Sequence, residues 1–254
     1  MMASPWLVRR PQAAPLMRLY CFSYAGGSAA VYAGWQALLG PEVEVCAVQL
    51  PGHGARMGEA PLSALAQVVE AVAAVIARQG PLPFAFFGHS LGALLAFELA
   101  RHCMRQRLAL PVRVFVSGSD APAMRCNLPR LHVLPDAQLI AALRQYNGTP
   151  AELLAHRELM ALVLPMIRAD FALVENYAYR SFLRLPVPFT VLAGRDDAHV
   201  DLAQLDGWRK ETSASCDFAM FDGDHFFIDA CRAEVLACVA DALAPEYGKE
   251  RMTS

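Results

Sequence analysis

Short apolar segments alternate along the chain with longer segments whose apolar residues recur at helical spacing. The short segments have the length and the β-branched or aromatic content of strands, and they cover residues 17–22, 43–50, 83–88, 112–119, 188–194 and 216–221. Residues 62–79 and 91–107 instead repeat apolar positions as one face of a helix does. This alternation predicts crossover connections, a mostly parallel sheet and helices on both faces. We therefore predict an α/β fold, formed by residues 1–254 as a single domain.

One stretch departs from this alternation. From about residue 128 to residue 180 we expect no strand, but DAQLIAALRQY (136–146) and RELMALVLPMIRADFALVENYAY (157–179) have helical periodicity. Two adjacent strands are thus separated by a helical insertion of roughly fifty residues, and long insertions above the carboxyl edge of such sheets are often functional. We predict that 128–180 forms a helical lid over a substrate. The alternative is a helical excursion that packs on the sheet edge.

Composition narrows the classes of function. The 254 residues are 56% hydrophobic and 18% charged, and the formal net charge is −2. A chain of this size buries a large core, and its charge creates no strong field for nucleic acid or an anionic membrane. No apolar run reaches the roughly 18 residues of a membrane span, and Arg9, Arg10 and prolines interrupt the first residues, unlike a secretory signal. We expect a cytoplasmic protein without nucleic-acid or membrane partners.

The cysteines argue against a metal or disulfide scaffold. Their number is odd and no CxxC pair occurs, whereas zinc sites and disulfide frameworks need paired or regularly spaced cysteines. We expect most of them to be small core residues and expect no metal. The seven positions are Cys21, Cys46, Cys103, Cys126, Cys216, Cys231 and Cys238.

The stretch FFGHSLG (86–92) carries the first candidate chemistry. Ser90 lies in a G-x-S-x-G pattern between a predicted strand ending at Phe87 and a helix beginning near Leu91. This pattern is the nucleophile elbow, a turn so sharp that Gly88 and Gly92 have no room for side chains. The turn lifts the serine Oγ above the sheet, where the Leu91 backbone N–H points at a developing oxyanion. We predict that Ser90 is a nucleophile; a glycine-rich turn with a solvated serine is the alternative.

A nucleophilic serine needs a histidine base and an orienting carboxylate, which follow in the order Ser, Asp, His in this arrangement. His225 lies in FDGDHFFID, after the last predicted strand, and is the best candidate; a core histidine is the alternative. VLAGRDDAHV offers Asp196 and Asp197, and the usual spacing of three residues after Gly194 favours Asp197, which leaves Asp196 as a turn residue. The other histidines considered lie on or beside the elbow, or in the insertion where they could touch substrate: His89, His102, His132 and His156.

A second oxyanion donor is expected in the loop after the first predicted strand. That loop reads FSYAGGSAAVY (22–32), and Gly26 and Gly27 allow a tight turn that presents the Ala25 backbone N–H toward Ser90. A nucleotide phosphate loop is the alternative interpretation of these glycines. The G-x-G-x-x-G and G-K-[ST] signatures of such loops are both absent.

Four separated segments resemble the type II thioesterases, the stand-alone editing enzymes of nonribosomal peptide and polyketide assembly lines. They read LYCFSYAGGSAAVYAGWQALLGPEVEVCAVQLPGHGAR (19–56), FFGHSLGALLAFELA (86–100), LAGRDDAHV (192–200) and DGDHFFI (222–228). The similarity runs in register from about residue 17 to 243. It implies the α/β-hydrolase fold, a helical lid at 128–180, a triad of Ser90, Asp197 and His225, and an oxyanion hole of the Ala25 and Leu91 backbone N–H groups.

The resemblance also implies a substrate. It would be an acyl or aminoacyl thioester on the phosphopantetheine arm of an acyl or peptidyl carrier protein. We expect the enzyme to be a monomer and to need no cofactor. A medium-chain fatty acyl thioesterase or a small-ester hydrolase would keep the same triad and differ in lid and pocket. A non-catalytic binding protein that retains the hydrolase shell is the remaining alternative.

The chain departs from the family pattern in three places. Ser23 replaces a usual proline, His53 a usual arginine in P-G-R-G, and Asp224 a common glycine. None of these changes removes a predicted catalytic group. A set of basic residues on and after the elbow helix could attract an acidic carrier domain, or could form a solvated basic face; they are Arg101, Arg105, Arg107 and Arg113.

Overall fold

The computed structural model describes residues 4–125, 130–146, 148 and 151–251, and Cys126 and the first residues of the predicted insertion lie outside them. Within these residues a seven-stranded sheet has the order β1-β3-β2-β4-β5-β6-β7. Its strands are β1 (Leu7–Arg9), β2 (Met17–Phe22), β3 (Val43–Val48), β4 (Phe84–His89), β5 (Val114–Ser117), β6 (Phe189–Gly194) and β7 (Cys216–Phe221). The β1–β3 pair is antiparallel and the other neighbours are parallel. The mostly parallel sheet is thus confirmed.

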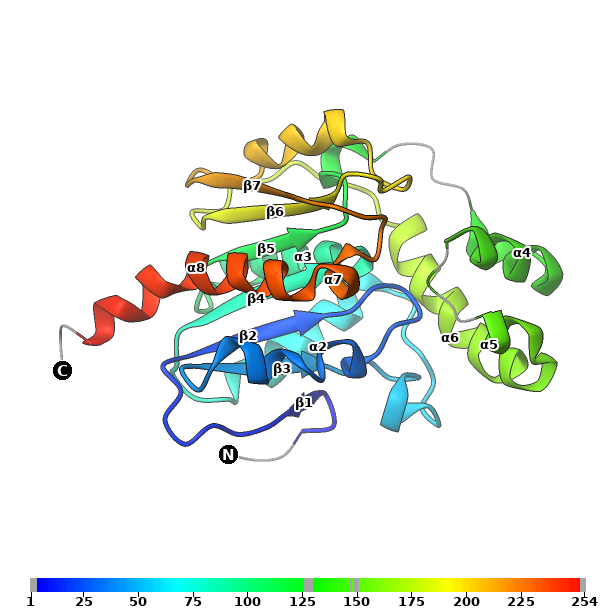
Figure 1. The fold of residues 1–254 in the computed structure, drawn as a ribbon, viewed down its shortest axis with the longest axis horizontal. Helices are drawn as coiled ribbons and strands as arrows, with labels where there is room; N and C mark the ends of the chain where they lie inside the picture. Colours follow the sequence, from blue (N-terminus) through cyan, green and yellow to red (C-terminus); the bar gives the residue numbers. More distant parts are fainter. Residues whose placement is uncertain (1–3, 126–129, 147, 149–150, 252–254) are drawn as a thin grey trace.

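Helices cover both faces of this sheet (Figure 1). Helices α2 and α3 share one core with side chains such as Phe86, and α1 and α8 share a second core with side chains such as Phe87. Successive strand residues point to opposite faces, so neighbouring phenylalanines serve separate cores. The helices are α1 (Trp35–Leu39), α2 (Leu65–Ala77), α3 (Leu91–Arg105), α4 (Asp136–Tyr146), α5 (Ala151–Ala155), α6 (Arg157–Glu175), α7 (Phe227–Ala230) and α8 (Arg232–Arg251), with short 3-10 helices η1 (Ala29–Tyr32), η2 (Gly54–Arg56), η3 (Pro122–Met124), η4 (Leu131–Val133) and η5 (Leu202–Lys210).

The segment between β5 and β6 carries α4, α5 and α6, which lie together at one end of the sheet (Figure 1). They have a small core of their own that includes Leu139, Leu143 and Ile167. Helix α6 ends at Glu175, so the helical pattern that we extended over 176–179 was wrong there. The role of this insertion as a lid stays a prediction.

Strand β4 ends at His89, one residue beyond the predicted apolar segment 83–88 and two residues beyond Phe87, where we placed the start of the elbow turn. The elbow that follows is crowded by backbone. A Cβ added to Gly88 would lie 1.9 Å from the carbonyl oxygen of Gly92, and one added to Gly92 would lie 2.0 Å from that of Phe22. Both elbow glycines are therefore required for the close approach of β4, α3 and the loop after β2.

We predict that Gly92→Ala lowers the free energy of unfolding by more than about 3 kcal/mol, because the new Cβ meets backbone that cannot move away. Denaturant unfolding followed by circular dichroism measures this loss. Gly58→Ala is the matched control, because a Cβ at Gly58 has no atom within 4 Å among the described residues. Equal stability of the two variants would contradict the crowded elbow.

Candidate active site

Ser90 stands at the turn between β4 and α3 in a backbone conformation that L residues rarely adopt, with φ 57° and ψ −113°. Two backbone hydrogen bonds hold it there: the Ser90 N–H donates to Ser117 O at 2.8 Å, and its carbonyl accepts from the Ala93 N–H at 3.0 Å. The Leu91 N–H is at the first position of α3, where no intrahelical acceptor exists. The helix dipole adds partial positive charge at this place.

His225 and Asp197 form a buried hydrogen-bonded pair. The His225 Nδ1 lies 2.7 Å from Asp197 Oδ2, and the other carboxylate oxygen accepts the His199 backbone N–H at 2.9 Å. Each residue is 6% exposed. A carboxylate only accepts, so Nδ1 carries the hydrogen and Nε2 of a neutral His225 keeps a lone pair. This arrangement suits a general base.

Asp196, the competing carboxylate, is exposed and makes a turn contact, in which its backbone N–H donates to Gly223 O at 3.0 Å. The loop after β6 meets the loop after β7 closely, because a Cβ on Gly194 would lie 2.5 Å from Asp224 O. Glycine at this place lets the two loops bring Asp197 and His225 together. The Asp224 carboxylate instead accepts the Phe226 N–H at 2.8 Å and caps the turn.

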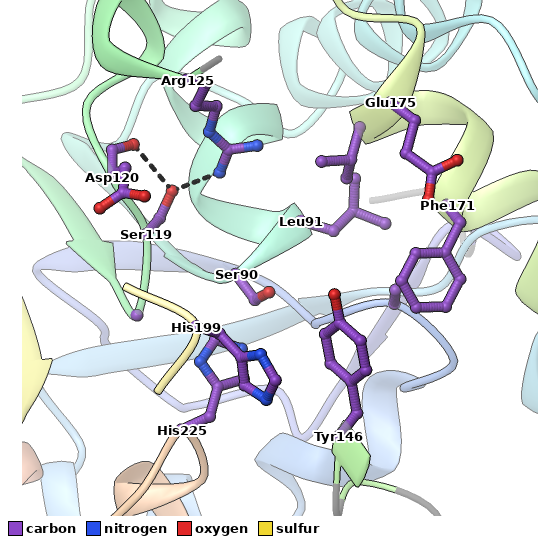
Figure 2. A pocket seen from close by; sticks show the side chains of 13 residues that line it. Ser90, Leu91, Ser119, Asp120, Arg125, Tyr146, Phe171, Glu175, His199 and His225 are labelled. Carbon is purple, nitrogen blue, oxygen red and sulfur yellow. Dashed lines mark hydrogen bonds between the residues drawn. The ribbon is translucent and has the colours of Figure 1, made fainter. Parts of the chain in front are cut away.

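Ser90 and His225 line one cavity of about 100 Å³, together with Ala25 and Leu91 (Figure 2). All of the predicted site residues therefore meet at the carboxyl end of the sheet, with Asp197 behind His225. The remaining lining residues come from the loop after β5, from the insertion and from the loop after β6: Gly118, Ser119, Asp120, Arg125, Tyr146, Phe171, Val174, Glu175 and His199.

Sequence reasoning did not identify the polar wall of this cavity. Arg125 donates to Ser119 Oγ beside Asp120 (Figure 2), and burial lowers the pKa of Arg125 and raises the pKa of Asp120. The Tyr146 ring of α4 stacks on the His199 ring at 4.1 Å with an interplanar angle of 3°. Burial, and then the nearby His225, lower the pKa of His199. The one local signal for His199 in the sequence was its position two residues after Asp197.

The other candidate histidines do not line the cavity. His89 is fully buried, its Nδ1 lies 2.9 Å from Ser117 Oγ, and its ring lies 5.0 Å from the His225 ring. Burial holds the pKa of His89 well below its usual value, so it packs as a neutral ring. His132 pairs with Glu175, His156 caps α6 through the Leu159 N–H, and His102 lies on α3.

Three of the four basic residues that could attract a carrier domain or form a solvated face have acidic partners. Arg101 is buried and lies 2.7 Å from Glu98, Arg105 lies 3.7 Å from the same carboxylate, and Arg113 lies 3.2 Å from Asp217. Among the residues that the structure describes, no cluster of His, Cys, Asp and Glu could hold a metal ion. No helix in the same residues has the length and apolar character to cross a bilayer.

The thioesterase domain family matches residues 17–243. The gramicidin S biosynthesis protein GrsT of Aneurinibacillus migulanus is 40% identical over 232 residues, which cover 91% of each chain. The medium-chain S-acyl fatty acid synthase thioesterase of Rattus norvegicus is 31% identical over 227 residues, covering 87% of this chain and 84% of that protein. The solved type II thioesterase BorB from the borrelidin biosynthetic cluster has a TM-score of 0.87 at 34% identity and covers 96% of this chain and 99% of its own.

The likeness to BorB covers nearly the whole chain, and together with the mostly parallel sheet it confirms the predicted α/β-hydrolase fold. With four sequence motifs in register and relatives matched over nearly their full length, this protein belongs to the thioesterase family and, within it, to the type II thioesterases.

Proposed function

We propose that this protein is a serine thioesterase that hydrolyses acyl or aminoacyl thioesters from the phosphopantetheine arm of carrier proteins, and so clears misprimed or stalled assembly lines. One observation carries the proposal: Ser90, His225, Ala25 and Leu91 line a single cavity, and Asp197 is hydrogen-bonded to the histidine. In this proposal Ser90, His225 and Asp197 form the triad.

The chemistry proceeds in two halves. Ser90 Oγ bonds to the thioester carbon while its proton passes to His225 Nε2, and the resulting oxyanion accepts hydrogen bonds from the Ala25 and Leu91 N–H groups. The C–S bond then breaks, and the pantetheine sulfur leaves with the proton from His225. Water next gives its proton to His225 and attacks the acyl carbon. Collapse of the second oxyanion frees the acid, and Ser90 regains its proton.

The cavity favours short acyl groups. Its volume of about 100 Å³ is smaller than the cavity of ~150 Å³ that holds benzene in an engineered protein. Its wall combines the Asp120 and Arg125 side chains with the apolar Phe171 and Val174 side chains, so it offers contacts to both polar and apolar parts of an acyl group. One relative is a medium-chain thioesterase, so a preference for longer acyl chains is the alternative to be tested.

The insertion acts as a lid in this proposal, because α4 and α6 supply part of the cavity wall. Tyr146 comes from α4, and Phe171, Val174 and Glu175 come from α6 (Figure 2). An acyl group bound at Ser90 would therefore contact side chains of the insertion.

We predict that Tyr146→Ala raises the ratio of kcat/KM for octanoyl-pantetheine to that for acetyl-pantetheine by about tenfold, since removing the ring opens the wall to a longer chain. Tyr146→Phe keeps the stacked ring and is the matched control, with a ratio close to that of the wild type. An unchanged ratio in Tyr146→Ala would show that α4 does not bound the acyl group.

The proposed function is tested by release of free acid from an acetyl or aminoacyl carrier protein, compared with the same acyl group on free pantetheine. We expect release from both substrates and faster release from the carrier, because the partner protein adds binding energy that is realised in the transition state. A preference for octanoyl chains or for oxyesters would favour the other hydrolases. Substrate binding without release would favour a non-catalytic binding protein.

A further inference from the structure

His53 is a buried histidine whose two ring nitrogens both face oxygen acceptors. It is 3% exposed, its Nδ1 lies 3.0 Å from Pro51 O, and its Nε2 lies 2.8 Å from Asp170 Oδ2. Neither a carbonyl nor a carboxylate has a hydrogen to donate. Both contacts are therefore hydrogen bonds only when both nitrogens carry hydrogens, which makes His53 an imidazolium.

Asp170 links this cation to the loop after β2. Its side chain comes from α6 and is 2% exposed, and the same Oδ2 atom that faces His53 accepts the Gly26 backbone N–H at 2.7 Å. Helix α6 also packs on this loop, because a Cβ on Gly26 would lie 3.6 Å from Ile167 Cγ1. One carboxylate oxygen thus joins α6, the loop before η2 and the loop after β2.

The bonded loop is the one that carries a proposed oxyanion donor. The Gly27 N–H donates to Tyr24 O at 2.9 Å, and Gly26 has φ 79°, as the third residue of a type II turn requires. Ala25 is the second residue of that turn and lines the cavity beside Ser90. The bond from Gly26 to Asp170 is therefore an anchor one residue away from the Ala25 N–H.

The charge of His53 decides the strength of this anchor. A neutral imidazole has one N–H, so one of the two nitrogens would turn a lone pair toward an oxygen at hydrogen-bond distance, which loses a bond and adds repulsion. Burial lowers the pKa of His53, but the bond and charge of Asp170 and the carbonyls of Pro51 and Leu50 outweigh it, so the pKa stands above its usual value.

No second charge competes for His53 among the described residues that pack on it. Arg56 of η2 directs its guanidinium to Glu59 and to Gln49 O, and Asp170 of α6 is the carboxylate that faces the ring. From the turn after β2, the Gly26 backbone N–H approaches the Asp170 oxygen that faces His53. The Asp170 carboxylate is therefore the charged group that faces the His53 ring among these residues.

We propose that protonated His53 is a positioning residue that, through Asp170, holds the Tyr24–Gly27 turn in its catalytic place, and that hydrolysis falls at alkaline pH when His53 loses its proton. The inference rests on the proposed function, because the Ala25 N–H matters to the rate only if an oxyanion forms at Ser90.

The sign of the pH dependence follows from the raised pKa. A group whose pKa is higher in the folded state contributes stabilisation that is complete below its usual pKa and is lost as the pH rises through the folded value. The stabilisation by protonated His53 is therefore lost on the alkaline side of the pH profile.

The test compares kcat and KM of the wild type, His53→Arg and His53→Gln from about pH 6 to about pH 10, a range that brackets a raised histidine pKa. We expect wild-type kcat to fall at least about threefold on the alkaline side, and His53→Arg to abolish that fall because guanidinium stays charged. His53→Gln should lower kcat about tenfold at every pH with little change in KM, since oxyanion placement acts in the transition state.

His102→Arg is the matched control, because it makes the same substitution on α3 away from the cavity, and it should keep the wild-type profile. An alkaline fall that persists in His53→Arg, or that also vanishes in His102→Arg, overturns the inference. Histidine NMR of the wild type without substrate gives an independent readout: a His53 pKa at or below the usual histidine value also overturns it. A wild type that releases no acid at any pH instead contradicts the proposed function.

Discussion

Ser90→Ala is expected to lower kcat for thioester release by about 10⁶-fold, the loss found when the nucleophile of a serine protease is removed. The expected loss is this large because every later step passes through the bond between Ser90 Oγ and the acyl carbon. The rate of acid release from an acetyl carrier protein, corrected for spontaneous hydrolysis, measures the effect. Mass spectrometry of the quenched wild type should also detect the acyl group on the peptide that contains Ser90.

The fold should survive this substitution. Ser90 is held by its backbone N–H and carbonyl, which alanine retains, so the midpoint of thermal unfolding should stay close to that of the wild type. Ser63→Ala, at an exposed position before α2, is the control and should keep full activity. Substantial acid release by a folded Ser90→Ala enzyme would rule out the acyl-enzyme route.

Asp197→Asn is expected to lower kcat by about 10⁴-fold, comparable to the loss when the triad aspartate of a serine protease becomes asparagine. The Asp197 carboxylate accepts the hydrogen on His225 Nδ1. An asparagine amide can donate to that nitrogen instead, which moves the ring hydrogen to Nε2 and removes the lone pair that accepts the Ser90 proton. Steady-state kinetics with acetyl-pantetheine measures the loss.

Asp196→Asn provides the matched control, because it makes the same chemical change one residue away on an exposed side chain. Its kcat should stay within about twofold of the wild type, as is usual for surface substitutions away from special features. The reverse order of effects, with Asp196→Asn the slower enzyme, would assign the orienting role to Asp196.

The parts of the site that could be predicted from sequence depend on short local patterns. The elbow around Ser90 could be predicted because its glycines, its strand and its helix lie within a few residues of one another. Asp197 and His225 could be predicted because each follows a recognisable strand, and the parallel sheet brings those strand ends to one edge.

The features that escaped prediction depend on packing between distant segments. His53 and Asp170 are separated by 117 positions, and no pattern near either residue indicates the other. Tyr146 and Phe171 lie on amphipathic helices, where an aromatic residue that lines a cavity has the same spacing as one that fills a core. Strand β1 has three residues, none fully buried, so it lacks the apolar run that revealed the other strands.

The backbone at Ser90 restricts which side chains could ever act from this position. Its φ of 57° is tolerated by few L residues, and a branched β-carbon fits that region poorly because it meets the adjoining peptide groups. Threonine has the same hydroxyl as serine but carries an additional methyl group at that carbon. Cysteine is unbranched and has serine's shape. The elbow therefore admits serine or cysteine as its nucleophile and excludes threonine on steric grounds, before any question of reactivity arises.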